Sequence, residues 1–217
     1  KKTLAPSILA AGLLTVASAS NAALLDFQGW ISTYGEQGFD NSAPFTLSDS
    51  GLTLTATAYE TPGMIDSFVY MDDSFNGIIG GMGVCSALNA NAQCINSADD
   101  NVSLDGMNAE ILSWNFDQSI TQMTLELGDS EHYDFNNSGI EYSLDGSIWS
   151  LATTDIDGFV TLQLNGSNQI DFRTAGATVQ DYFYIRNADV AVVPVPAAVL
   201  LFGSGLLGLI GIARRRG

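Results

Sequence analysis

Apolar and polar residues alternate one for one in several short stretches of the chain. Leu52 and Leu54 alternate with Thr53 and Thr55, and the pattern continues to Tyr59. A repeat of two places every second side chain on the same face, which is typical of a strand with one buried face. Few stretches have a helical repeat. The same alternation recurs in residues 112–116, 123–127, 160–164 and 170–173.

Turn-forming residues separate these stretches, and the clearest turn is Asp145-Gly146. It lies between residues 141–144 and 147–150, and Asp-Gly supplies the positive φ angles that a two-residue hairpin turn requires. The sequence therefore predicts a tight β-hairpin at this point. About eight to ten short antiparallel strands without βαβ alternation predict an all-β fold, an antiparallel two-sheet β-sandwich that is jelly-roll-like.

The first residues have the layout of a secretory signal peptide. Lys1 and Lys2 precede an apolar stretch, residues 4–16, and small residues then continue to Ala22. A charged start, a short hydrophobic region and a small-x-small site define such a peptide. We expect residues 1–22 to be the signal peptide, with cleavage after Ala22, and residues 23–192 to form one exported domain.

The other end of the chain has the pattern of a membrane segment. Residues 197–213 are 17 residues without a charge, followed by Arg214, Arg215 and Arg216. A helix of this length approaches the hydrocarbon thickness of a bilayer. Arginines next to a span tend to stay cytoplasmic. The sequence therefore predicts one C-terminal transmembrane helix, residues 197–213, with the domain outside the inner membrane.

The charge distribution agrees with export and excludes one class of function. Between the two terminal segments lie only two basic residues, Arg173 and Arg186, against all 24 Asp and Glu residues, which gives this part a formal charge of −22. Such a surface repels nucleic acid and attracts cations and basic partners. We therefore expect no nucleic-acid partner.

The tail also resembles a known sorting signal. Val193, Pro194, Val195 and Pro196, the glycine-bearing apolar segment and the arginine cluster together resemble the PEP-CTERM signal of Gram-negative bacteria. The resemblance implies recognition by an exosortase, an integral-membrane cysteine protease of bacteria that make exopolysaccharide. Val195 stands where the family has a glutamate. The two prolines forbid helix and leave an extended segment that a protease can reach. The alternative is a tail anchor that is never cut.

The predicted exported domain carries a second resemblance. Residues 81–85, Gly-Met-Gly-Val-Cys, then residues 99–101 and Glu110 before residues 112–117 resemble the domain of short exosortase-dependent surface proteins. Together the two resemblances imply a secreted cell-surface protein, or a protein of the exopolysaccharide matrix of a biofilm. The role that they imply for the domain is structural or adhesive.

Two features of the predicted domain concern its stability. Cys85 and Cys94 are the two cysteines of the chain, and export to an oxidising compartment predicts a disulfide between them. Calcium takes oxygen ligands from carboxylates and amides, so Asp99, Asp100 and Asn101, which follow the stapled loop, are the preferred candidate ligands. Solvated acidic loops are the alternative. The other acidic candidates are residues 72–73 and residues 129–134.

Catalysis and ligand binding have weaker signals. We expect His132, the one histidine, to be a surface loop residue. One histidine and two disulfide-bonded cysteines would not supply the usual ligands of a zinc site. No Gly-x-Ser-x-Gly elbow is present, so we expect a non-enzymatic domain. One alternative is a carbohydrate-binding module that uses Trp30 and Trp149 as sugar platforms, whereas the alternation around Trp114 assigns it to the core. A further alternative is a calcium-dependent hydrolase.

Overall fold

The computed structural model describes residues 22–61, 65–75, 77–95, 100–105, 108–176 and 181–193. The predicted signal peptide, the sorting motif from Pro194 onwards and the predicted membrane segment lie outside the described residues. Within them, no helix is long and apolar enough to cross a membrane. The part of the chain that the structure describes is mostly β-strand, which confirms the predicted all-β class.

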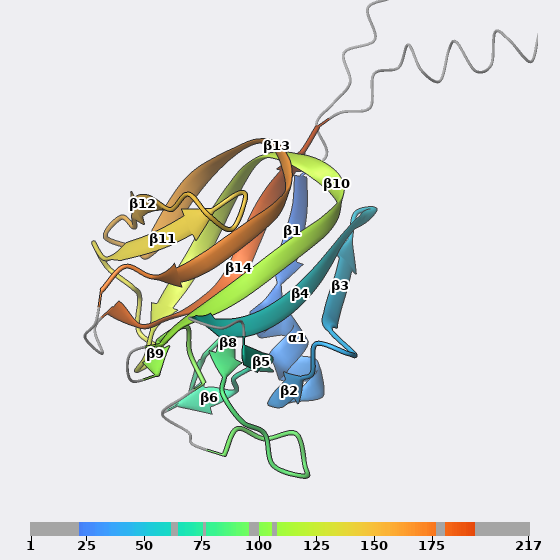
Figure 1. Ribbon diagram of the computed structural model, residues 1–217. Helices are drawn as coiled ribbons and strands as arrows, with labels where there is room; N and C mark the ends of the chain where they lie inside the picture. The colour runs from blue at the N-terminus through green and yellow to red at the C-terminus, as the bar shows by residue number, and fades with distance from the viewer. Residues whose placement is uncertain are drawn as a thin grey trace, which may run out of the picture. The chain divides into compact units, whose positions relative to one another are not determined.

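The described residues form one helix and fourteen strands (Figure 1). In chain order the elements are β1 (Ala22–Asp26), α1 (Phe27–Tyr34), β2 (Gln37–Phe39), β3 (Phe45–Asp49), β4 (Leu52–Thr61), β5 (Ile65–Met71), β6 (Ser74–Phe75), β7 (Ile78–Ile79), β8 (Met82–Cys85), β9 (Leu104–Asp105), β10 (Asn108–Asp129), β11 (Gly139–Ser143), β12 (Ser150–Thr153), β13 (Phe159–Thr174) and β14 (Phe183–Val192).

Twelve of the strands belong to one hydrogen-bonded sheet that closes on itself. Strands β14, β8, β5, β4 and β10 follow one another, and β10 pairs again with β14, so these five strands form a closed barrel. Strands β13, β11 and β12 extend the sheet beyond β10, and β6 and β7 form a separate pair. The predicted jelly-roll sandwich is therefore not confirmed as such.

The closure depends on β10, which changes partner along its length. Its first part, Ala109–Phe116, pairs with β4, and its second part, from Ile120 to Asp129, pairs with β14. Between the two parts the register with β13 shifts, at Asn115–Ile120 and again at Ile120–Gln122. Such irregularities bend a strand and increase its twist. One strand thus passes from one side of the barrel to the other.

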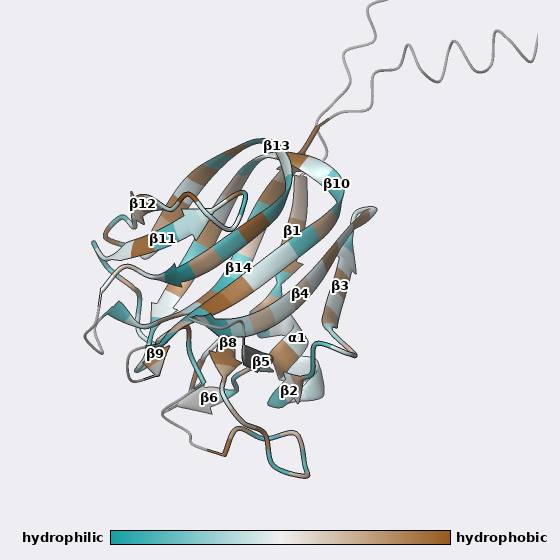
Figure 2. Cartoon of the chain, in the orientation of Figure 1, coloured by the Kyte–Doolittle hydropathy of each residue, from teal (hydrophilic) through white to brown (hydrophobic). Residues whose placement is uncertain are grey.

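The predicted alternation is confirmed in the burial of β4 and of residues 123–127 and 160–164, whereas Ser113 and Asp171, which lie between predicted core residues, are buried as well. In β4, Leu52, Leu54, Ala56 and Ala58 are buried and the residues between them are half-buried. Figure 2 shows the same change of hydrophobic and hydrophilic positions along the long strands. Trp114 is fully buried, as predicted. The buried apolar residues form one core, which also includes Met123, Leu125, Leu127, Val160, Leu162, Leu164, Ile170 and Phe172.

The sequence pattern did not predict helix α1. Asp26 caps it, since the Asp26 Oδ1 atom accepts a hydrogen bond of 2.6 Å from the Gly29 amide. At its end the Gly35 amide donates to the Ile31 carbonyl over 2.7 Å, with φ of +80° at Gly35. Phe27 and Ile31, four residues apart, are the buried residues of the helix. This short apolar face attaches α1 to the core.

The predicted hairpin between β11 and β12 is confirmed, but the prediction of a two-residue turn is wrong. The register Tyr142–Ser150 leaves seven residues in the connection. The Asp145 carboxylate accepts hydrogen bonds from the amides of Ser147 (2.9 Å) and Ile148 (2.8 Å), which forms a wider loop around Gly146. These hydrogen bonds lower the pKa of Asp145 to about 2.

The predicted disulfide is confirmed. Cys85, the last residue of β8, is bonded to Cys94, nine residues later. The enclosed loop packs back on the domain, because the Gly38 amide of β2 donates to the Ala92 carbonyl over 2.8 Å. A Cβ atom at Gly38 would lie 2.5 Å from the Leu88 side chain. A larger residue at this position would require the Leu88 side chain to move.

Removing the disulfide should lower the stability of the fold. A Cys85→Ser/Cys94→Ser variant should lose about 2–3 kcal/mol of unfolding free energy, because closing a loop of this size restricts the unfolded chain. Denaturation with and without reductant measures the effect. Reductant should destabilise the wild-type chain and leave the variant unchanged. Equal midpoints for the oxidised and reduced wild-type chain would contradict the prediction.

Candidate functional site

Buried polar side chains gather where the start of β14 meets three loops. Asp72 follows β5, Asp100 and Asn101 precede β9, His132 lies between β10 and β11, and Tyr184 is the second residue of β14. Their exposed fractions are 8%, 7%, 3%, 5% and 1%, in that order. We call these five residues the polar cluster. A buried polar group is costly unless it is paired, so its contacts decide its role.

The structure corrects the expected position of His132. Its backbone has the positive φ of a loop, 66°, but its side chain is buried instead of lying on the surface. The His132 Nε2 atom lies 2.6 Å from the Asp72 Oδ2 atom, and its Nδ1 atom lies 3.0 Å from the Ile78 carbonyl oxygen. Because both neighbouring oxygens are hydrogen-bond acceptors, they favour the cationic form of the ring, which carries a proton on each nitrogen.

The expected calcium ligands are only partly described. Asp99 lies outside the described residues, while Asp100 and Asn101 are buried in the polar cluster instead of forming a solvated loop. The Tyr184 hydroxyl donates to the Asp100 Oδ1 atom, and the Asn101 Oδ1 atom has no partner among the described residues. Among those residues, no group of three His, Cys, Asp or Glu side chains is placed to hold a metal ion. The calcium site stays a prediction.

The pKa values of Asp100 and His132 are both raised in the polar cluster. Burial, together with the nearby charge of Asp72, raises the pKa of Asp100 to about 7, although Tyr184 donates to it. Burial alone would lower the pKa of His132, but the hydrogen bonds to Asp72 and Ile78 and the charges of Asp72 and Asp100 outweigh it. The pKa of His132 is therefore raised above 6.5.

Close backbone approach makes this packing possible. A Cβ atom at Gly83 would lie 2.1 Å from the Asp100 carbonyl oxygen, and one at Gly80 would lie 2.6 Å from the Asp72 Oδ2 atom. Two segments thus pack directly against the backbone of β8 and of the residues before it. Gly83 of the Gly-Met-Gly-Val-Cys stretch therefore has a structural reason, and so has Gly81, where a Cβ atom would lie 2.6 Å from the Ile185 carbonyl oxygen.

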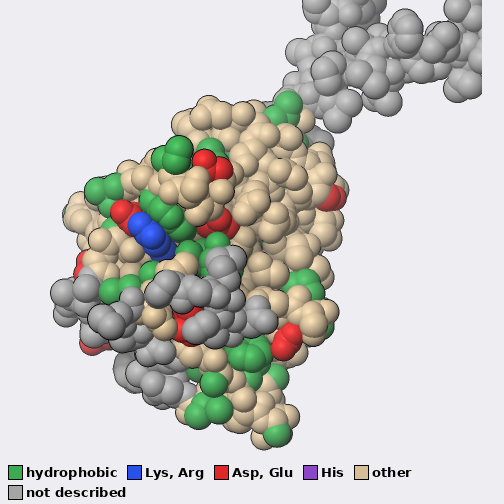
Figure 3. Space-filling model, viewed as in Figure 1, with side chains coloured by type: hydrophobic (Ala, Val, Ile, Leu, Met, Phe, Trp, Pro, Cys, Tyr) green, Lys and Arg blue, Asp and Glu red, His purple; other side chains and the backbone are tan. Residues whose placement is uncertain are grey.

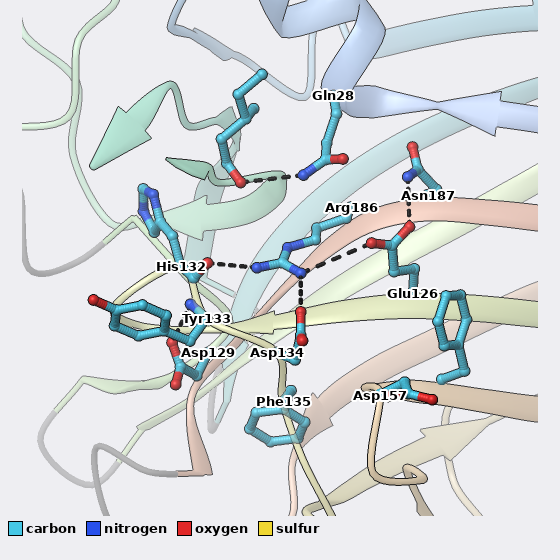
Figure 4. A network of polar contacts seen from close by, with 12 residues as sticks. Gln28, Glu126, Asp129, His132, Tyr133, Asp134, Phe135, Asp157, Arg186 and Asn187 are labelled. Carbon is cyan, nitrogen blue, oxygen red and sulfur yellow. Dashed lines mark hydrogen bonds and ion pairs between the residues drawn. The ribbon is translucent and has the colours of Figure 1, made fainter. Parts of the chain in front are cut away.

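Arg186 of β14 connects the polar cluster to the barrel (Figure 4). Its guanidinium donates to the Asp134 Oδ1 atom over 2.7 Å and to the His132 carbonyl oxygen, and it lies 3.8 Å from Glu126. Glu126 in turn accepts a hydrogen bond of 2.7 Å from Asn187. Arg186 is only 4% exposed. It holds the loop after β10 in the position that brings His132 to Asp72.

The acidic residues 129–134 border a surface hollow of about 370 Å³. Two of its three carboxylates are already engaged. The Asp129 Oδ1 atom accepts from the amides of Glu131 (2.9 Å) and Tyr133 (2.8 Å), and Asp134 pairs with Arg186. The carboxylates of Asp129 and Asp134 therefore shape the loop and fix Arg186.

One pair of buried carboxylates faces across two strands. Glu60 of β4 lies directly opposite Glu110 of β10, and they are 5% and 0% exposed. Each accepts hydrogen bonds from its own neighbours: Glu60 from Ser67 and Asn108, and Glu110 from the amide and hydroxyl of Ser103. Neither lines the hollow near residue 131 or the larger one between β12 and β13.

The two tryptophans singled out for ligand binding are on different elements. Trp30 of α1 stacks with the rings of Tyr34, Phe39 and Phe45, whose centroids lie 4.9, 5.6 and 5.4 Å away. Trp149, in the loop before β12, has the Arg173 guanidinium 4.0 Å from its ring centroid. Both rings are half-buried. The structure does not bring them together into one row.

The stability of the chain should fall as the pH rises. Asp100 keeps its proton in the folded chain up to about pH 7 but loses it near 3.8 when unfolded, so the folded chain binds more protons between these values. Stability should therefore fall by about 2 kcal/mol from pH 5 to 8. His132 acts in the same direction, since the stability from its raised pKa is lost above its folded pKa.

Urea denaturation across this pH range tests the assignment to Asp100. An Asp100→Asn variant keeps an acceptor for Tyr184 and should show a flatter dependence on pH. Asp189→Asn, on an exposed position of β14, changes the charge equally and should leave the slope unchanged. An equal slope in the Asp100→Asn variant and the wild type would refute the assignment.

Removing the histidine should be costly. A His132→Asn variant tolerates the positive φ but leaves Asp72 buried without a cation, so the free energy of unfolding should fall by about 3 kcal/mol. Asp72→Asn in the His132→Asn background should recover part of this loss. A double variant as unstable as the sum of the two single variants would show that the two side chains do not interact.

Comparison of the chain with protein-family models gives no match, and comparison with curated protein sequences gives none either.

Proposed function

We propose that the chain is a secreted, non-catalytic protein of the cell surface or exopolysaccharide matrix, in which a sandwich-like β-domain has a structural or adhesive role. One observation carries the proposal. Ala22, the first residue of β1, pairs with Ala191 near the end of β14, so the domain begins and ends at the same end of the barrel (Figure 1). A tail that follows Val193 would hold the whole domain from one end.

The polar cluster supports a structural role more than a catalytic one. A general base needs a nitrogen free to take a proton, whereas both ring nitrogens of His132 face acceptors. The facing carboxylates Glu60 and Glu110 are likewise engaged with their neighbours. These contacts give no support to the hydrolase alternative.

Carbohydrate binding receives less support than a structural role. A sugar stacks on an exposed aromatic face, while Trp30 packs in an aromatic cluster and Trp149 has Arg173 over its ring. We retain calcium as the one proposed cofactor, at Asp100 and Asn101 with Asp99. A cation there would have to replace the proton that Asp100 holds.

The sorting and the location belong to the same proposal. We propose that the domain crosses the inner membrane, that an exosortase-type enzyme recognises residues 193–196, and that the product remains at the envelope or in the extracellular polymer. The formal charge of −22 between the terminal segments favours retention by cations and basic groups and disfavours nucleic acid.

The intact mass of the protein from the surface layer of its native host tests the sorting. We expect a C-terminus near Pro194 or Pro196 that carries extra mass, part of which deglycosylation removes. A Pro194→Ala/Pro196→Ala variant should keep its full tail, and a matched Ala197→Ser/Ala198→Ser variant should be processed like the wild type. A wild-type mass that extends through Arg216 would instead indicate a plain membrane anchor.

A further inference from the structure

Strands β12 and β13 follow one another in the chain but do not pair. Residues 154–158 join them. Strand β12 pairs with β11, whereas the first part of β13 pairs with β10. No pairing in the described sheet joins β12 to β13. A hollow of about 640 Å³ lies between them, lined by residues 151–155, residues 159–163 and Tyr142. We call this hollow the wedge.

The backbone groups that border the wedge have no strand partner. The Thr154 amide donates to the Ser138 carbonyl over 3.0 Å, so by alternation the backbone groups of Leu151 and Thr153 point away from β11. In the same way, the Leu127 amide of β10 donates to the Gly158 carbonyl over 3.0 Å. By alternation, the backbone groups of Thr161 and Gln163 therefore point away from β10. Two open strand edges therefore border the same space.

The narrow end of the wedge is closed by its own turn. The Asp155 amide donates to the Phe159 carbonyl over 2.8 Å, and the Asp155 Oδ1 atom accepts from the Phe159 amide over 2.9 Å. Beyond Phe159 the strands separate because each joins a different part of the sheet. The hollow reaches Thr161 and Gln163 of β13, which suits an added extended segment.

Exposed apolar side chains lie in the wedge and next to it. Leu151 and Phe159, which line the wedge, are 66% and 41% exposed. Ile148 and Ile156, in the connections before and after β12, are 72% and 70% exposed, and Figure 3 shows hydrophobic side chains on the β11–β12 side of the molecule. Strand β12, Ser-Leu-Ala-Thr, has no charge or proline. Proteins usually protect an edge strand with such residues, so this edge is suited to pairing.

The negative charge of the domain favours a basic segment in the wedge. The two arginines of the described residues are already paired, Arg173 with Glu141 and Arg186 with Asp134, and the region between the terminal segments carries −22. A second copy would bring the same negative charge. A basic segment would be attracted, since Asp155 lines the wedge and Asp157 is exposed in the adjoining turn.

We propose that the wedge binds an extended, basic segment of a partner protein as an added strand between β12 and β13. Its backbone bonds to the two open edges, its alternate apolar side chains cover Leu151 and Phe159, and its lysines or arginines meet the surrounding carboxylates. The site goes beyond the proposed function, because binding does not depend on processing of the tail.

A synthetic peptide tests the wedge directly. The probe is fluorescent Lys-Lys-Val-Thr-Val-Thr-Val-Thr-Lys-Lys, titrated into the full chain in a non-ionic detergent and followed by anisotropy. We expect saturable binding that weakens at least about tenfold in Leu151→Lys, because the new charge repels the peptide and protects the edge. Leu24→Lys is the matched control, since Leu24 is 51% exposed on β1, and should bind like the wild type.

Two further measurements separate strand addition from charge attraction. A peptide methylated on alternate backbone nitrogens keeps its charge but should bind at least about tenfold more weakly. Bound peptide should also slow amide hydrogen exchange at Leu151, Thr153, Thr161 and Gln163. Absence of saturable binding, equal binding of the methylated peptide or equal binding by Leu151→Lys would each overturn the proposal. A wild-type dimer that the Leu151→Lys substitution dissociates would also overturn the proposal, because a second copy of the chain would then occupy the edge.

Discussion

The pairing of β10 with two successive partners is the interaction on which the rest of this structure depends. Because one strand pairs first with β4 and then with β14, the sheet closes and its apolar side chains share one core. The same register sets Gly128 opposite Tyr184 and Asp129 opposite Phe183. The loop that follows β10 therefore starts beside the first residues of β14. The rings of His132 and Tyr184 meet edge to face for this reason, with centroids 5.0 Å apart.

Each of the three basic side chains of the domain is paired with a carboxylate. Arg186 and His132 are buried and paired with carboxylates, and Arg173 lies between Glu141 and Trp149. Buried charges are costly when either partner is missing, so each pair fixes the segments that provide it. As a result the carboxylates at the surface have few cations nearby. Apart from the buried Glu60, Asp72, Asp100, Glu110 and Asp171, the described carboxylates lie at least partly at the surface.

The sequence predicted those features that depend on neighbouring residues. The alternation of Leu52 to Tyr59 gave a strand with one buried face, and Trp114 was assigned correctly to the core because its neighbours alternate with it. The pair of Cys85 and Cys94 followed from the expected compartment. Helix α1 was missed although Asp26 before Phe27 and Ile31 is a capping signal, since its apolar face is only two residues long.

Other features depend on residues far apart in the chain and have no local signal. His132 lies in a polar, acidic stretch that is typical of a surface loop. Its burial depends on the contact with Asp72, sixty residues earlier in the chain. The turn at Asp145-Gly146 was predicted too short because the Asp145 carboxylate bonds to Ser147 and Ile148 instead of leaving them to β12. The closure of the sheet required the change of partner within β10, which the alternation alone does not indicate.

The position of β14 has a mechanical consequence. It is the last strand before the tail, and between Asn187 and Ala191 it is hydrogen-bonded by β1 on one edge and by β10 on the other. The Val193 amide adds a bond of 2.8 Å to Ser119 at the exit. Interstrand hydrogen bonds run across the strand axis, so tension along a tether at Val193 would load both rows in shear. A domain held in this way would resist extraction by many bonds together.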